Sequence, residues 1–352
     1  MDNNAFEFLK TILSTPSPSV HEQQIQQVVR EYVADFAAET TTDLHGNVIA
    51  CVNPGAEFRV MFAGHCDQIG MLISHIDTEG FLYAQTIGGW DPQQLIGQRM
   101  TVWAESGPIN AVISRKPIHL LQQEERTQVV KIEDMWLDIG AKSYDEASEV
   151  VRIGDPVTLK LGFQPLRNNL ANAPGMDNRT GVWVVMEALR RCSKNNLRCS
   201  VYAVSTVQEE IGLRGARTSA FSIDPHVGIA VDVTHATDCP TIDKRQQGDI
   251  ALGRGPVVFR GPNANPRVVE RLANVAKEKE ISFQYSALGR ATSNDANTIQ
   301  INRGGVAAGV VAIPNRYMHS AVETISLDDI DRAADLLAEF VTAIEPGADF
   351  TP

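Results

Sequence analysis

Apolar residues along the chain recur with two different spacings. Over residues 21–36 they fall at helical intervals, so that Ile25, Val29 and Val33 share one face of a polar segment. Unbroken apolar runs, such as FRVMFAGH at 58–65, are typical of strands covered on both faces. The pattern predicts helices over 21–36, 177–192, 266–280, 295–302 and 327–344, and strands over 47–52, 58–65, 199–206, 227–233, 283–286 and 305–313.

Alternating strands and helices indicate an α/β fold with a mostly parallel sheet and helices on both faces. Between residues 68 and 163 the pattern changes to short strand-like runs separated by Gly, Pro and Asp, with a single helical segment at 142–150. The α/β pattern continues on both sides of this region. We therefore expect an inserted β-rich domain, a barrel or sandwich, over 68–163, within a catalytic domain formed by residues 1–67 and 164–352.

Composition narrows the range of partners and compartments. The chain has 43 acidic and 31 basic residues and a net charge of -12, which disfavours binding to nucleic acid or to an anionic membrane surface. Its five cysteines form no CxxC pair, which argues against a disulfide framework and a thiolate zinc site. The first residues lack the basic region and long apolar core of a signal peptide, and no apolar run is long enough to span a membrane. We expect a cytoplasmic protein with neither nucleic acid nor membrane as partner.

Candidate chemistry lies where the predicted core strands end. Seven acidic or imidazole side chains occupy such places: His65, Asp67, Asp177, Glu209, Glu210, Asp232 and His319. Open α/β sheets place their sites just outside the carboxyl ends of the strands, so these residues are expected to converge. Each is ordinary by itself, and Asp177 serves equally well as a helix N-cap. Together they would repel one another unless two divalent cations joined them.

The residue types also restrict which metal ions fit. Imidazole and carboxylate ligands without thiolate suit zinc, cobalt or manganese. Residues i and i+2 of an extended segment project to the same side, so Asp67 is expected to reach the outer ring nitrogen of His65 and fix its tautomer. Cys66 then points away, as a small buried apolar residue.

The adjacent carboxylates Glu209 and Glu210 follow the strand predicted at 199–206. Neighbouring side chains at a strand end diverge, so one can bind metal while the other stays free beside an attacking water. We assign Glu210 as the ligand and Glu209 as the general base, which later gives its proton to the leaving amine. A metal pair lowers the pKa of water and polarises a substrate carbonyl, which is the chemistry of a metal-dependent hydrolase.

Several stretches spread over residues 60–325 resemble the M42 family of dinuclear metallo-aminopeptidases, within the larger group of co-catalytic zinc exopeptidases. The stretches that carry the resemblance are GHCDQIGML, GGWDPQQLIGQRM, KPIHLL, NNLANAPGMDNRTGV, STVQEEIGLRGA, VDVT, GRGP, SNDANTIQ and IPNRYMHSAVE. The inserted region lies between the first and second candidate ligands, as in M42. Related M20 enzymes insert their extra domain between the fourth and fifth ligands, and M18 aminopeptidases have longer chains.

The resemblance implies a role for each candidate residue. Asp177 would bridge two metal ions, His65 and Asp232 would complete one site, and Glu210 and His319 would complete the other. Zinc or cobalt is the expected metal, and manganese is also suited. The PDZ-like inserted domain would assemble dimers into a dodecamer that admits short, unfolded peptides.

Two positions depart from the family pattern. Asn178 follows Asp177 where many relatives have a second acid, and Asn294 stands where a threonine is usual. Neither position is a predicted ligand, so the departures bear on metal preference and pocket shape.

The function expected is release of N-terminal residues from short peptides. The alternatives are an M18-like or M20-like amidohydrolase or deacylase, a glycoside hydrolase, and a non-catalytic assembly. A glycoside hydrolase requires two carboxyl groups across the sugar and has no use for metal-bound His65 and His319. A non-catalytic assembly has no use for the free carboxylate of Glu209.

Overall fold

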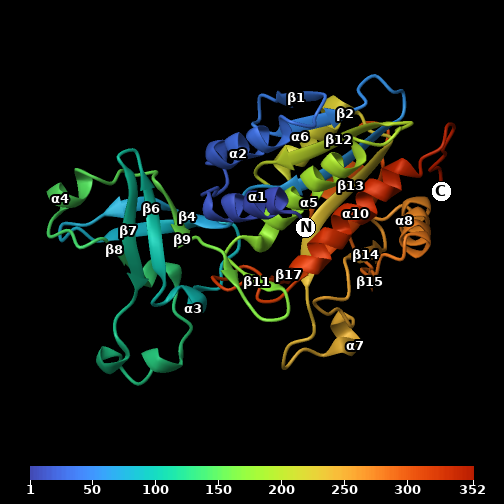
Figure 1. The fold of residues 1–352 in the computed structure, drawn as a ribbon. Helices are drawn as coiled ribbons and strands as arrows, with labels where there is room; N and C mark the ends of the chain where they lie inside the picture. The colour runs from blue at the N-terminus through green and yellow to red at the C-terminus, as the bar shows by residue number, and fades with distance from the viewer.

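The computed structural model describes all residues, 1–352, and contains two main bodies, a helix-covered sheet and a closed barrel (Figure 1). The helices are α1 (Asn3–Ser14), α2 (Gln23–Val33), α3 (Pro92–Leu95), α4 (Tyr144–Ser148), α5 (Met176–Cys192), α6 (Arg214–Ile223), α7 (Lys244–Gln247), α8 (Pro266–Glu278), α9 (Asp295–Gln300) and α10 (Leu327–Thr342). Three short 3-10 helices lie at Ile118–Leu120, Glu125–Thr127 and Ile132–Asp134.

Eight strands form the large sheet, in the order β1-β2-β12-β3-β13-β16-β14-β15. They are β1 (Glu39–Thr42), β2 (Val48–Val52), β3 (Arg59–His65), β12 (Ser200–Thr206), β13 (Val227–His235), β14 (Val257–Arg260), β15 (Gln284–Ala287) and β16 (Ala307–Asn315). The central strands β12, β3, β13 and β16 run parallel, as expected. Towards the edges the pairs β1–β2, β2–β12 and β14–β16 are antiparallel, so the sheet as a whole is mixed.

Helices cover both faces of this sheet, which confirms the α/β prediction. On one face α1, α2, α5, α8 and α10 pack in the largest apolar core, and on the other face α6 and α9 pack in smaller clusters. Side chains of β3 alternate between the two layers: Val60 and Phe62 belong to the first, and Met61 and Ala63 belong to the second. A buried strand whose residues serve two cores reads as a continuous apolar run, which explains the pattern in the sequence.

The β-rich region is a closed barrel of six antiparallel strands, in the order β4-β5-β8-β7-β6-β9. Its strands are β4 (Gly70–Ile76), β5 (Leu82–Ile87), β6 (Arg99–Ala104), β7 (Gly107–Ser114), β8 (Trp136–Asp138) and β9 (Pro156–Leu159). The barrel has an apolar core of its own. It lies to one side of the sheet and helices in Figure 1. A small third sheet joins β10 (Gln164–Pro165), β11 (Leu170–Asn172) and β17 (Thr324–Ser326).

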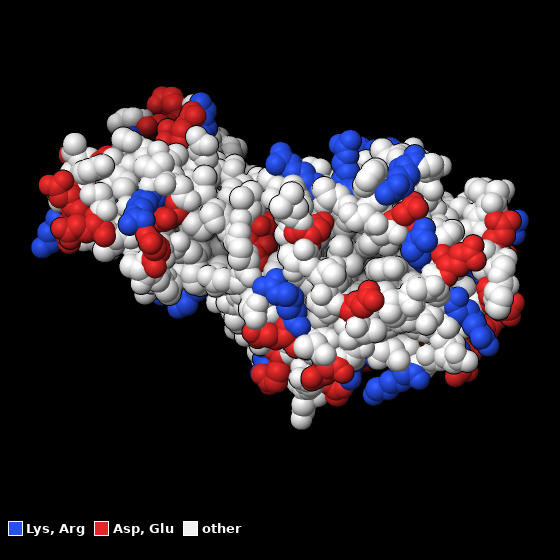
Figure 2. All heavy atoms as spheres, turned by 90° about the horizontal axis from the view of Figure 1, so that it is seen from above, with Lys and Arg blue, Asp and Glu red and all other residues white.

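The surface is consistent with the composition. Acidic and basic side chains are interspersed over the face seen in Figure 2, with no large basic patch there. None of the helices has both the length and the apolar composition required to cross a membrane.

Candidate metal centre

The candidate residues lie at one edge of the large sheet. His65 is the last residue of β3, Asp232 lies in the second half of β13, and His319 follows β16. β12 ends at Thr206, and Glu209 and Glu210 lie in the segment that follows it. Because these four strands are parallel, their carboxyl ends meet at one edge.

Asp177 stands at the centre of the group, in the first turn of α5. Its Oδ1 lies 3.2 Å from His65 Nε2, and its Oδ2 lies 3.2 Å from His319 Nε2. One carboxylate therefore faces two imidazoles, each through a different oxygen.

The other carboxylates divide between the two imidazoles. Asp232 Oδ1 and Glu209 Oε2 lie 3.7 and 3.8 Å from His65 Nε2. Glu210 Oε1 lies 3.5 Å from His319 Nε2. Donor atoms of His65, Glu209 and Asp232 form one compact group, and those of His65, Asp177 and Glu210 form another. Glu209 is therefore placed close enough to His65 to reach the same ion.

These separations fit divalent metal ions. Two ligand atoms on one tetrahedral zinc lie about 3.3 Å apart when each is about 2.0 Å from the ion. The five contacts above span 3.2 to 3.8 Å. Glu210 Oε1 is also buried without a hydrogen-bond partner, a costly state for a carboxylate oxygen that a cation would relieve. The residues present thus suit zinc-like ions in both ligand type and spacing.

The buried carboxylates of this group favour positive charge on the two histidines. The facing carboxylates of Asp177 and, second, Glu210 raise the pKa of His319 to about 11. Burial disfavours charge on His65, but the facing carboxylates, Glu209 foremost, outweigh burial and raise the pKa of His65 well above its ordinary value. Burial raises the pKa of both Glu209 and Glu210. Without cations, protons must balance this group of acids.

Asp67 lies beside His65 but contacts it in an unexpected way. The closer partner of His65 Nδ1 is the main-chain oxygen of Asp67, at 3.1 Å, while the carboxylate oxygen is at 3.4 Å. The Asp67 carboxylate instead accepts hydrogen bonds from the backbone N–H groups of Glu209 and Glu210, at 2.9 and 3.2 Å, and from the Ser19 hydroxyl at 2.7 Å. Asp67 therefore orients the two glutamates as well as the imidazole.

Cys66, between His65 and Asp67, is fully buried within the main apolar core. Burial raises the pKa of its thiol, so it stays protonated and apolar in character. This confirms its interpretation as a packing residue.

Two buried acids beside the centre were not predicted. Glu323 is 1% exposed, and it accepts hydrogen bonds from the backbone N–H groups of Asp177 at 2.8 Å and His319 at 2.9 Å. Glu323 is the last residue of the stretch IPNRYMHSAVE, four residues after His319, and this position is the signal that the sequence offers. Asp295 is 3% exposed and accepts from the Thr206 hydroxyl, but its Oδ1 has no partner. Burial raises the pKa of Glu323 to about 8 and that of Asp295 to about 7.

The two departures from the family pattern have local explanations. The Asn178 amide donates to the Val231 carbonyl at 2.7 Å, and its oxygen accepts from the Gly181 N–H at 3.0 Å. Only a side chain that both donates and accepts makes both contacts, so an ionised acid does not replace it. Asn294 caps α9 by accepting from the Ala296 N–H, a task that threonine also performs.

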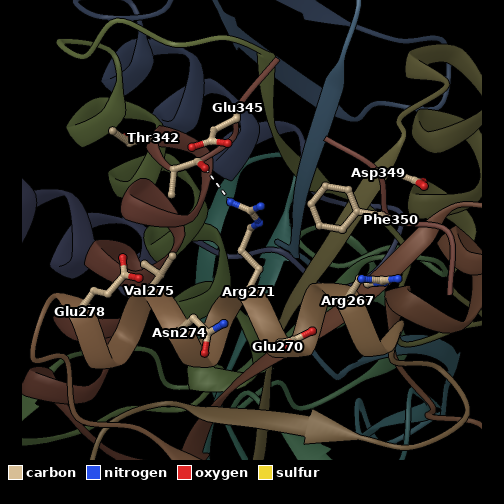
Figure 3. Close-up of a pocket in the computed structure, with 11 residues that line it drawn as sticks. Arg267, Glu270, Arg271, Asn274, Val275, Glu278, Thr342, Glu345, Asp349 and Phe350 are labelled. Carbon is tan, nitrogen blue, oxygen red and sulfur yellow. Dashed lines mark hydrogen bonds between the residues drawn. The ribbon is translucent and has the colours of Figure 1, made fainter. Parts of the chain in front are cut away.

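A large hollow lies elsewhere, between α8 and the C-terminal segment, with a volume of about 510 Å³ (Figure 3). Arg271 spans it and donates to the Ala343 carbonyl at 2.6 Å. The hollow contains no histidine and none of the predicted site residues.

Comparison with known proteins shows extensive similarity to aminopeptidases. The sequence pattern of the family described as M42 glutamyl aminopeptidase matches residues 46–336. The chain is 39% identical to a lysyl aminopeptidase of Pyrococcus furiosus, over 99% of each chain.

Solved structures give the same picture. A TET aminopeptidase from a marine-sediment Thaumarchaeota archaeon has a TM-score of 0.94 at 35% identity, covering 98% of this chain and 97% of that one. The TET1 peptidase of Pyrococcus horikoshii, described as assembling into a tetrahedron or a large octahedral shell, has a TM-score of 0.85 at 30% identity, covering 97% of this chain and 100% of that one. The family match gives no support to the deacylase, glycoside hydrolase or non-catalytic alternatives.

Proposed function

The chain belongs to the M42 glutamyl aminopeptidase family, and we propose that it releases N-terminal residues from short peptides at a centre built for two divalent metal ions. The observation that carries this proposal is the position of Asp177, whose two carboxylate oxygens each lie 3.2 Å from a different imidazole. A carboxylate held between two histidines in this way is suited to bridging a pair of ions.

The proposed ligand roles are those that the resemblance to M42 implies, and the short distances from Asp177 to both imidazoles support them. Asp177 would bridge, His65 and Asp232 would hold one ion, and Glu210 and His319 would hold the other. Bound metal would supply Lewis acidity that polarises the scissile carbonyl and eases deprotonation of water. Zinc and cobalt are the proposed ions, with manganese as a further candidate, because the donors are nitrogen and oxygen without thiolate.

Glu209 is proposed as the general base. Its carboxylate would take a proton from the attacking water as the new C–O bond forms, and would pass that proton to the amine nitrogen as the C–N bond breaks. Burial raises the pKa of Glu209, which favours a group that must hold a proton between these two steps. Asp67 fixes the backbone of Glu209 through the 2.9 Å hydrogen bond and so holds the base in place.

We further propose that residues 68–163 form a separate domain that builds a homo-oligomer, a dodecamer assembled from dimers, while residues 1–67 and 164–352 form the catalytic domain. The segment between β7 and β8 supports this, because Ile118, Leu120 and Val129 are 59%, 64% and 59% exposed. Exposed apolar side chains gathered on one segment are typical of protein–protein contacts. Light scattering tests the assembly, and a monomer would contradict it.

A panel of aminoacyl-anilide substrates tests the activity. Hydrolysis should stop with a chelator and return when zinc, cobalt or manganese is added, and the panel identifies the preferred N-terminal residue. Cleavage of free-amine substrates but not of N-blocked ones distinguishes an aminopeptidase from a deacylase. Full activity in the metal-free protein would contradict the proposal.

A further inference from the structure

His319 depends on the barrel for the orientation of its ring. Its side chain is one-third exposed, and its Nε2 faces Asp177 and Glu210. On the other side of the ring, Nδ1 lies 2.8 Å from the main-chain oxygen of Gly89, which follows β5 of the barrel. A carbonyl oxygen only accepts, so Nδ1 carries a proton and Nε2 is the nitrogen left to bind a metal ion.

The barrel anchors Gly89 firmly. The neighbouring Trp90 donates its indole N–H to the Gly70 carbonyl at 2.9 Å and packs against the barrel core. Ala321, two residues after His319, packs against the same core. The loop that carries His319 and the turn that carries Gly89 are therefore both attached to the barrel.

Gly88 borders the other ligand of the same proposed ion. Its φ is +74°, a conformation that favours glycine. A Cβ atom at this position would lie 3.3 Å from Glu210 Oε2 and 2.6 Å from Ile69 Cγ2. Any side chain would push the turn away from Ile69, which is buried, and would carry the Gly89 carbonyl with it.

We propose that the Gly88–Gly89 turn is a positioning element of the metal centre: the Gly89 carbonyl sets the His319 ring, and the bare Gly88 leaves the space that Glu210 occupies. This inference rests on the proposed two-ion function. The turn supports only the ion assigned to Glu210 and His319, because the hydrogen bonds and close carboxylate contacts of His65 and Asp232 involve no barrel residue. The barrel thus helps to position the proposed metal ligands of the catalytic domain.

The test is Gly88→Ala, with Gly97→Ala as its matched control. Gly97 also lies in the barrel region with φ +81°, but a Cβ there meets no atom within 4 Å, so it reproduces the backbone strain without the contact. Zinc and cobalt binding to the full-length protein is measured by calorimetry, and bound metal is counted by elemental analysis. Gly88→Ala should lower the affinity for one of the two ions by about tenfold or more, the usual effect of disturbing a residue that orients a metal ligand. Gly97→Ala should bind both ions as the unaltered protein does.

A second variant keeps the test sharp if Gly88→Ala fails to fold. Trp90→Phe removes the indole hydrogen bond but keeps an apolar ring. It should lower the affinity for the same ion by roughly threefold or more. Added metal should restore peptidase activity in both variants, which loss of a purely structural contact would not allow. Unchanged affinity for both ions in folded Gly88→Ala and Trp90→Phe would overturn the inference. If the unaltered protein itself bound no metal or cleaved no peptide, the proposed function would fail instead.

Discussion

The Asp67 carboxylate accepts a hydrogen bond from the backbone N–H of Glu209 at 2.9 Å, although the two residues lie on different strand ends, after β3 and β12. The next N–H, that of Glu210, donates to the other oxygen of Asp67. A single buried acid thus fixes the turn that presents both glutamates. This arrangement explains how two adjacent like charges are held in place beside the imidazoles.

Replacing the proposed base should separate catalysis from metal binding. Glu209→Gln should lower turnover by about 100-fold or more, because the amide cannot accept the proton of the attacking water. Metal content should stay at that of the unaltered protein. Turnover on an aminoacyl-anilide and elemental analysis of the same sample provide the measurement.

A matched control uses the same chemical change elsewhere. Glu270→Gln alters an exposed residue in the hollow of Figure 3 and should leave turnover unchanged. Loss of metal from Glu209→Gln would contradict the role of base and show that Glu209 is a metal ligand. The 3.8 Å distance between its Oε2 and His65 Nε2 is compatible with that role.

Removing a histidine ligand should release metal. His65→Ala lacks the nitrogen that faces Asp177, Asp232 and Glu209, so elemental analysis should find less metal per chain and activity should fall. His75→Ala, an exposed histidine of the barrel, serves as the control and should keep its metal. Full metal occupancy in His65→Ala would refute the ligand assignment.

Restoring the acid that many relatives have after the bridging aspartate should destabilise this chain. In Asn178→Asp the ionised side chain no longer donates to the buried Val231 carbonyl and faces it with a negative charge. The free energy of unfolding should fall by about 1–3 kcal/mol, the cost of an unsatisfied buried group. Denaturant titration measures it, and an equal or higher stability would count against this explanation.

Asp329 should give a measurable pH dependence of stability. Burial raises its pKa to about 6. Hydrogen bonds from the backbone N–H groups of Gly253 and Gly255 favour the charged form, but they lower the pKa by less than burial raises it. Between about pH 4 and 6 the folded state then holds more protons than the unfolded state. The contribution of Asp329 to the free energy of unfolding is therefore complete below this window and is lost as the pH rises through 6.

The corresponding variant isolates this contribution. Asp329→Asn does not titrate, so the stability difference between it and the unaltered protein should shift over pH 4 to 6 and stay constant above. Denaturant midpoints at fixed protein and metal concentrations measure that difference. If the stability difference between the two proteins did not change with pH, Asp329 would not be the source of the pH dependence.

The sequence was informative wherever burial imposed a pattern. β3, which ends at His65, and β13 as far as Asp232 are almost entirely buried, so their apolar runs were recognisable. Their parallel arrangement then made convergence of the ligands predictable, because parallel strands end at one edge. The structure brings all seven predicted residues to that edge.

Elements without such a pattern were missed. All four residues of β1 are exposed, and β8 has three residues, too few to show alternation. The buried face of α6 consists mainly of small residues such as Gly215, Ala216 and Ala220, which give no strong apolar periodicity. Helix α1 was also not predicted, although Leu9 and Ile12 are buried.

Residues that act through the backbone gave equally little signal. Glu323 receives N–H groups from two distant segments, and Gly89 offers only its carbonyl oxygen. Neither contact depends on a side-chain type at the partner position. The three-dimensional arrangement is needed to find them.

The most direct test of the account is a crystal structure of the metal-loaded protein with anomalous data collected at the zinc or cobalt edge. Two anomalous peaks per chain are predicted, about 3.5–4 Å apart. One should lie among His65, Asp177 and Asp232, and the other among Asp177, Glu210 and His319. A single peak, or peaks away from Asp177, would contradict the bridged two-ion centre.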